Sequence, residues 1–168
     1  MIVRRHEKAG TTSAATYSPC GLYRYALTRE WDAAARRILW VMLNPSTASE
    51  VRNDPTIERC ERRSHRMGYG AMRVANIFAF RATRPAELAR AADPVGAENH
   101  GELQAAVAWA DDIVAAWGAH GRLLGRGAAA AADLRRICRP VLHLGLTSQG
   151  EPRHPLYVAY AVEPTLWL

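Results

Sequence analysis

The stretch Trp40-Val41-Met42-Leu43-Asn44-Pro45-Ser46-Thr47-Ala48 decides the fold that the sequence predicts. The apolar run from Ile38 to Leu43 is typical of a strand buried on both faces of a sheet, and it ends at Asn44. Asn is poor in strands, and open α/β sheets bind their ligands outside the carboxyl ends of their strands. We therefore expect Asn44 to mark a ligand site, the alternative being that it only caps a turn before Pro45.

A helix-start signal follows closely, in Asn53-Asp54-Pro55-Thr56-Ile57. Asp54 is a good N-cap, and proline is favoured at the first helical position. This pattern predicts a helix from Pro55 to Met67, which ends before Gly68.

The rest of the chain alternates between strand and helix patterns. Strands are predicted over residues 23–29, 38–43, 72–80, 112–117 and 140–144, and helices over 55–67, 85–92, 98–110 and 127–137. This order predicts right-handed βαβ crossovers and a three-layer α/β/α sandwich with a central, mostly parallel four-stranded sheet. The segment 23–29 is expected as an N-terminal edge strand. The 168 residues are interpreted as a single domain, with an apolar tail from residue 157 packed on it.

Composition indicates a cytoplasmic protein. No apolar run approaches the length of a membrane span, and the basic N-terminus lacks the apolar core of a signal peptide. The three cysteines are isolated from each other, which is typical of a reducing compartment and argues against disulfides or a zinc site.

The net charge of +6 is carried almost entirely by arginine, because Lys8 is the only lysine among 22 basic residues. Arg59, Arg62, Arg63 and Arg66 recur at the spacing of one helix face. Like charges on one face repel each other unless an anion lies opposite. We expect this face to contact a phosphate backbone, the alternative being a solvated surface.

Four polar clusters lie where strand ends are expected to converge, at residues 44–47, 76–83, 117–120 and 145–156. None contains a P-loop, a GxGxxG turn, a GxSxG elbow or an HExxH motif. Ser46 or Ser148 with His154 would form a nucleophile pair, but neither serine follows a strand-to-helix elbow. We expect no cofactor and no metal ion.

Several blocks of this sequence resemble a bacterial and phage family that is catalogued only as a domain of unknown function. They cover most of residues 23–157 and are Met42-Leu43-Asn44-Pro45-Ser46-Thr47-Ala48, Asn53-Asp54-Pro55-Thr56-Ile57 with Arg59-Cys60, Asn76-Ile77-Phe78-Ala79-Phe80-Arg81-Ala82-Thr83, and Asp93-Pro94-Val95-Gly96 with Asn99. The family name itself implies no activity.

A more distant resemblance does imply one. Met42-Leu43-Asn44-Pro45 is similar to the pocket motif of mismatch-specific and single-strand-selective uracil-DNA glycosylases, and residues 76–88 and 112–118 look like their next strands. His154-Pro155-Leu156 resembles their His-Pro-Ser-Pro-Leu loop without its serine, and Ser46 replaces their glycine after Asn-Pro. The resemblance implies a uracil-DNA glycosylase-like fold and a monomeric DNA glycosylase that flips a base and leaves an abasic site.

The resemblance also implies roles for particular residues. Asn44 would orient the attacking water, with Asp54 as the alternative carboxylate, and His154 would donate to the leaving base. Substrate contacts would come from Pro45, Ser46, Thr47, Asn76 and Phe78. Asn76 would read the base edge, and Phe78 or Trp40 would stack on the base. DNA contacts would come from Arg59, Arg62, Arg63, Arg66, Arg81, Arg153 and Leu156, with Leu156 as a wedge. The expected partner is DNA, single- or double-stranded, with no membrane and no obligate protein partner.

The residue after Asn44-Pro45 bears on the identity of the base. Strict uracil glycosylases carry a bulky tyrosine there, which excludes substituents at the pyrimidine C5 position, whereas this chain carries Ser46 and then Thr47. We therefore expect a C5-modified pyrimidine, such as the hydroxymethylated or glucosylated cytosine of phage DNA, and a role in defence against phage.

Two other functions fit the same residues. A hydrolase of free nucleotides or nucleosides would use the same pocket without the arginine face. A non-catalytic nucleic-acid-binding module would keep the arginine face without needing Asn44.

Overall fold

A computed structural model describes residues 1–168 and contains one eight-stranded sheet. Its strands, in spatial order, are β1 (Ile2–Lys8), β2 (Thr11–Tyr17), β3 (Arg24–Glu30), β5 (Ala71–Asn76), β4 (Arg37–Met42), β6 (Asp112–Ala115), β7 (Val141–His143) and β8 (Thr165–Leu166). The helices are α1 (Pro55–Arg66), α2 (Pro85–Arg90), α3 (Asn99–Trp109) and α4 (Arg126–Arg135), with short 3-10 turns at Ala119–Gly125 and Pro155–Tyr157.

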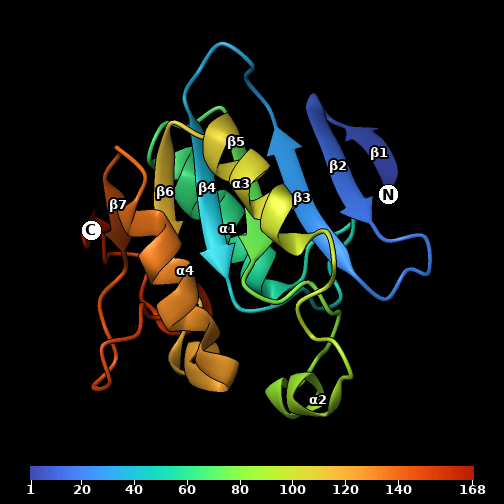
Figure 1. Ribbon diagram of the computed structural model, residues 1–168. Helices are drawn as coiled ribbons and strands as arrows, with labels where there is room; N and C mark the ends of the chain where they lie inside the picture. The colour runs from blue at the N-terminus through green and yellow to red at the C-terminus, as the bar shows by residue number, and fades with distance from the viewer.

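The predicted central, mostly parallel four-stranded sheet is wrong. The sheet is mixed and mostly antiparallel, because β1 with β2, β2 with β3, β3 with β5, and β7 with β8 all pair antiparallel. The parallel pairings are those of β4 with β5, β4 with β6, and β6 with β7. The predicted edge strand at residues 23–29 is interior, since the β1–β2 hairpin lies beyond it (Figure 1).

The hairpin escaped prediction because its apolar pattern is weak. Almost every residue of β1 is exposed, and only alternate residues of β2 are buried. The turn between the strands is formed by Ala9 and Gly10, both at positive φ, as tight hairpin turns require. No helix covers the hairpin in Figure 1. Its strands therefore bury few apolar side chains, and the sequence lacks the apolar pattern by which strands are recognised.

The strand β4 lies inside the core, and its side chains alternate between two apolar layers. Leu39 and Val41 pack with α3 and α4 on one face, and Ile38, Trp40 and Met42 pack with α1 on the other. All of these side chains are buried. The continuous apolar run at residues 38–43 is therefore explained by helices on both faces of the sheet, which Figure 1 shows around β4.

The start of α1 is as predicted. Asp54 is the N-cap, its side chain accepts a hydrogen bond from the Ile57 N–H, and Pro55 occupies the first turn. The predicted helix from Pro55 to Met67 is confirmed to within one residue, with Met67 as the C-cap.

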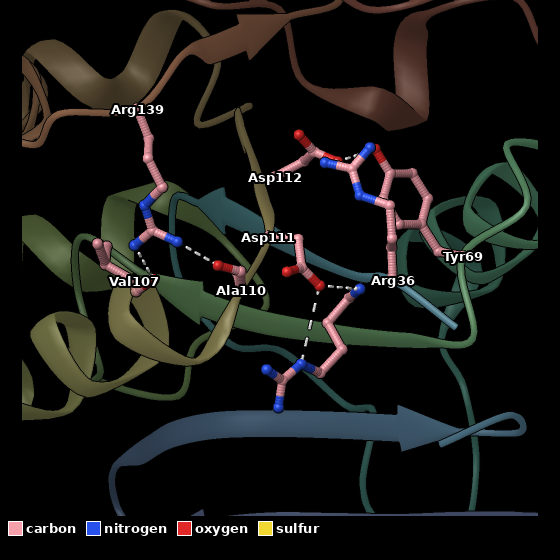
Figure 2. A network of polar contacts seen from close by, with 8 residues as sticks. Arg36, Tyr69, Val107, Ala110, Asp111, Asp112 and Arg139 are labelled. Atoms are coloured by element: carbon pink, nitrogen blue, oxygen red, sulfur yellow. Dashed lines mark hydrogen bonds and ion pairs between the residues drawn. The ribbon is translucent and has the colours of Figure 1, made fainter. Parts of the chain in front are cut away.

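Charged residues close the end of the sheet at which β4 and β6 begin (Figure 2). Asp112 forms an ion pair with Arg36 at 2.8 Å and accepts a hydrogen bond from the Tyr69 hydroxyl at 2.7 Å. Arg139 donates to the main-chain carbonyls of Val107 and Ala110. Arg36 and Arg139 therefore both have hydrogen-bond acceptors at this end of the sheet.

The C-terminal segment is held against α1 by arginine. The buried Arg63 guanidinium donates to the main-chain carbonyls of Val162 at 2.7 Å, Ala159 at 2.7 Å and Val158 at 3.0 Å. Arg59 donates to the carbonyls of Pro155 and Val158. These contacts satisfy backbone oxygens of a segment with almost no regular structure. The tail packs on the domain, as the sequence predicts.

We expect Arg63→Ala to lower the free energy of unfolding by about 3 kcal/mol, because it removes charge-assisted hydrogen bonds and leaves carbonyls without donors. Arg62, on the same helix, is exposed and pairs only with Glu58, so Arg62→Ala is a matched control that should leave the unfolding midpoint unchanged. Urea denaturation of both variants checks this. Equal midpoints for the two would refute the anchoring role of Arg63.

Candidate functional site

A cavity of about 490 Å³ opens at the carboxyl ends of β4 and β6. It is lined by the loop after β4, the start of α1, the loop before α2, the turn after β6 and the loop before the C-terminal 3-10 turn. The polar side chains that line it are Arg24, Asn44, Ser46, Thr47, Asp54, Thr56, Thr83, His120, Thr147, Arg153, His154 and Tyr157. All four of the polar clusters noted in the sequence supply residues that line this cavity.

Asn44 lines this cavity and has one side-chain acceptor without a partner. Its Nδ2 donates to the carbonyl of Pro45 at 2.9 Å and to that of Ala82 at 2.8 Å, so both amide hydrogens are used. Its Oδ1 has no donor within the chain, and the residue lines the cavity. Two carbonyls around Nδ2 require an NH₂ group, because an aspartate oxygen there would face two acceptors. This explains why the residue is Asn rather than Asp.

Asp54 is committed to backbone contacts. Its Oδ1 accepts from the Ile57 N–H at 2.9 Å, and its Oδ2 accepts from the Ala48 N–H at 3.3 Å. Each carboxylate oxygen retains a free lone pair, since an ionised carboxylate accepts about four hydrogen bonds. Asp54 therefore shapes the loop and also supplies the one carboxylate that lines the cavity.

His154 is a neutral donor. Burial lowers its pKa to about 4, against a smaller opposing effect of the Asp54 charge. Its Nδ1 accepts from the Leu156 N–H at 3.3 Å, which assigns the proton of the neutral ring to Nε2. Gly118 allows this approach, because a Cβ on it would lie 3.1 Å from the His154 Cβ and its φ is +73°. The Nε2–H is the donor left for the cavity.

Arg24, which the sequence analysis did not single out, also lines the cavity. The residue is buried, its Nη1 donates to the Ala48 carbonyl, and its Nε has no acceptor. Burial lowers its pKa to about 10, so it stays charged at neutral pH. In the sequence it looks like a polar position of an alternating strand, and only the path of β3 brings it inside.

Three predicted substrate contacts, Pro45, Asn76 and Phe78, do not line the cavity. Phe78 is fully buried in the apolar layer that contains α3 and α4, and Asn76 is buried at the end of β5. The Phe78 N–H donates to the carbonyl of Leu43, the residue after β4, and this hydrogen bond holds the chain after β5 against the end of β4. Neither residue lines the site, which corrects both roles. Pro45 is buried and does not line the cavity, and its carbonyl accepts a hydrogen bond from Asn44 Nδ2.

The predicted arginine face also needs correction. Arg59 and Arg63 donate to carbonyls of the C-terminal segment, and Arg63 is buried, so these two are not free for phosphates. Arg62 and Arg66 are exposed. The four arginines on this face of α1 therefore do not form one exposed surface, because the C-terminal segment covers Arg59 and Arg63.

Exposed groups border the cavity mouth instead. Arg153 lines the cavity, and a shallow hollow that shares Ser46 and Thr47 with it carries Arg52 and Arg81. Leu156 is half-buried, whereas Tyr157 beside it is 79% exposed. Arg52 and Tyr157 were missed in the sequence because nothing in their local pattern distinguishes them from ordinary loop residues.

No helix in the structure is both long and apolar enough to cross a membrane. No group of three or more His, Cys, Asp and Glu side chains is arranged to hold a metal ion. The polar groups that line the cavity are guanidinium, imidazole, hydroxyl, amide and carboxylate groups, which suit a polar organic ligand.

The low pKa of His154 makes stability depend on pH. The unfolded chain takes up this proton near pH 6.5 and the folded chain only near pH 4, so the unfolded state binds more protons between these values. We expect the free energy of unfolding to fall by up to about 3 kcal/mol from this group as pH drops through that window. Stability is regained as pH rises from about 4 to 6.5, and this contribution is fully present above pH 6.5.

Urea denaturation between pH 4 and pH 7 measures this effect as the difference between the wild-type chain and His154→Asn. The variant should lose that part of the pH dependence. The control His100→Asn, at an exposed helix position, should keep it. Parallel curves for the wild type and His154→Asn would show that the imidazole is not buried in its neutral form.

Comparisons with known proteins bear on the family alone. Neither the curated proteins nor the solved structures contain a match to this chain, and the likeness to uracil-DNA glycosylases has no support from them. A family model described as "Protein of unknown function (DUF1643)" matches residues 24–156, which confirms the resemblance to a domain of unknown function. The chain belongs to the DUF1643 family.

Proposed function

We propose that this protein hydrolyses the N-glycosidic bond of a nucleotide in DNA, with the base held in the cavity. One observation carries the proposal: an amide acceptor without a partner, Asn44 Oδ1, and a neutral imidazole donor, His154 Nε2–H, line the same cavity. An acceptor suits the orientation of a water molecule, and a neutral donor suits a leaving base on which negative charge builds.

The chemistry follows from these two groups. As the bond between C1′ and the base nitrogen breaks, its electron pair goes to the base and the sugar becomes oxocarbenium-like. The His154 Nε2–H donates a hydrogen bond to a base oxygen that gains this charge. Water held by Asn44 Oδ1 forms the new bond to C1′. Because an amide does not take up a proton, Asp54 is the carboxylate that receives the proton the water loses.

The cavity walls favour an enlarged base. Ser46 and Thr47 line the cavity and contribute hydroxyl groups, and no bulky side chain follows Asn44-Pro45. Hydroxyl groups satisfy a polar substituent that an apolar wall would leave without a partner. We therefore propose a C5-modified pyrimidine as the excised base, with hydroxymethylated or glucosylated cytosine of phage DNA as the leading candidates. Removal of such a base would damage phage DNA, and the biological role would be defence.

Exposed cations near the mouth support DNA as the substrate. Arg52, Arg81 and Arg153 border the cavity or its adjoining hollow, at positions suited to phosphates on either side of a flipped nucleotide. The exposed Tyr157 on the rim is suited to stack in the gap that the flipped base leaves. Arg62 and Arg66 remain candidates for phosphates further along the backbone.

A second candidate, a hydrolase of free nucleotides, is favoured by one observation. Arg59 and Arg63, half of the expected DNA-binding face, bind the chain itself, and a free nucleotide needs no such face. The non-catalytic module is less favoured, because Asn44 Oδ1 in the cavity has no structural partner to account for it.

We expect the protein to release base from DNA carrying C5-modified cytosine in preference to DNA carrying uracil. Asn44→Ala should lower the rate by about two to four decades, because a positioned polar group is lost, while DNA affinity changes little. Asn44→Asp should also be impaired, since its oxygen would face the carbonyls of Pro45 and Ala82. The assay counts abasic sites in a panel of modified oligonucleotides. Unchanged activity in Asn44→Ala would refute the mechanism.

We expect charge reversal at Arg52 and Arg153 to weaken binding to all DNA sequences alike and to reduce the salt slope by about one unit per lost phosphate contact. The control Arg136→Glu changes an exposed arginine at the far end of α4 and should leave the slope unchanged. Fluorescence anisotropy at several salt concentrations measures both. If the salt dependence of DNA binding is the same in the wild type, the Arg52 and Arg153 variant and Arg136→Glu, the free-nucleotide hydrolase is favoured.

A further inference from the structure

Arg24 is a buried charge that the reaction as described above does not use. The residue is only 2% exposed, yet its side chain makes one hydrogen bond, from Nη1 to the Ala48 carbonyl. Its Nε has no acceptor, and no carboxylate lies within ion-pair distance. A guanidinium has five N–H donors in a rigid fork. Most of the N–H groups of Arg24 therefore have no acceptor in the chain.

Other buried arginines in this chain are better satisfied. Arg29 donates to the Ser49 carbonyl at 2.6 Å and to Asn53 Oδ1 at 3.0 Å. Arg63 also has an Nε without an acceptor, but its two terminal nitrogens donate to three carbonyls. Neither of these side chains lines the cavity, whereas Arg24 does. Among these buried arginines, Arg24 has the fewest acceptors, and it is the one that lines the cavity.

The structure does not need a cation at this position for its own packing. A neutral amide donor would hold the Ala48 carbonyl equally well, and it would avoid the cost of burying a charge without a counter-ion. The carboxylate whose charge acts on Arg24 is that of Asp54, and its two oxygens already accept from backbone N–H groups. Around the cavity, two guanidinium groups, of Arg24 and Arg153, face this single carboxylate, which leaves an excess of positive charge.

We propose that Arg24 is a substrate-binding residue that holds an anionic group, a phosphate or a carboxylate, inside the cavity. A guanidinium matches both groups because its N–H fork binds two oxygens at once. The class of substrate in this inference rests on the proposed function. If the substrate is a nucleotide in DNA, the anion has two sources. It is either the phosphate of the nucleotide or an acidic substituent on the modified base.

Binding of small probes at pH 7 tests this inference. We expect isothermal titration calorimetry to show that 2′-deoxycytidine 5′-monophosphate, 5-carboxy-2′-deoxycytidine, or both bind the wild-type protein about ten- to a hundredfold more tightly than 2′-deoxycytidine. Preference for the first identifies a phosphate as the anion, and preference for the second identifies a carboxylate on the base. Equal affinity for all three probes overturns the proposal.

Variants assign the preference to Arg24. Arg24→Gln, checked for folding by circular dichroism, should lose the preference, whereas the control Arg29→Gln, which changes a buried arginine outside the cavity, should keep it. If Arg24→Gln does not fold, Arg24→Lys keeps the charge without the fork and should weaken anion binding at least severalfold. An unchanged preference in the folded Arg24 variant overturns the proposal.

These results are separable from the glycosylase assay. An Arg24-dependent preference for anionic probes without release of any base would support this inference and reject the proposed reaction. Base release from DNA without any anion preference would support the reaction and reject the role of Arg24.

Discussion

The carboxylate of Asp54 is the interaction on which the geometry of the cavity depends. One oxygen caps the first turn of α1 through the Ile57 N–H, and the other accepts from the Ala48 N–H in the loop that follows β4. The loop is thereby tied to a rigid helix end, with Arg24 bound to the Ala48 carbonyl from the opposite side. Asn44 lies at the start of this loop, so its orientation relies on a chain of backbone contacts rather than on a flexible connection.

The two ends of the central strands differ in how their polar groups are satisfied. Where β4 and β6 begin, Arg36 and Arg139 have acceptors, and Asp112 has two donors (Figure 2). Where they end, Asn44 Oδ1 and Arg24 Nε have no partner in the chain. Buried polar groups are costly unless they are hydrogen-bonded. Arg63 Nε and Asn76 Oδ1 also lack a partner but do not line the cavity, so Asn44 and Arg24 are distinguished by lining it as well.

Several residues that line the cavity could be identified from the sequence because their signals are local. Asp54-Pro55 marks a helix start through chemistry within four residues, and the apolar run at 38–43 marks a strand with both faces covered. Asn44 and His154 follow from residue types at strand ends. The roles of Phe78 and Asn76 were not predictable, since a position near a strand end does not reveal which way a side chain points. A shift of one residue moves a side chain to the opposite face.

The sequence by itself determined which segments form the buried strands and α1, because these depend on apolar periodicity and capping over short spans. Tertiary structure alone decided the mixed, mostly antiparallel sheet, because pairing partners are chosen by contacts between segments far apart in the chain. It also turned Arg63 inward, toward carbonyls 95–99 positions away, and brought Arg24 of β3 into the cavity. Charge patterns in a sequence do not reveal which arginines the chain itself will cover, because that depends on where a distant, irregular segment packs.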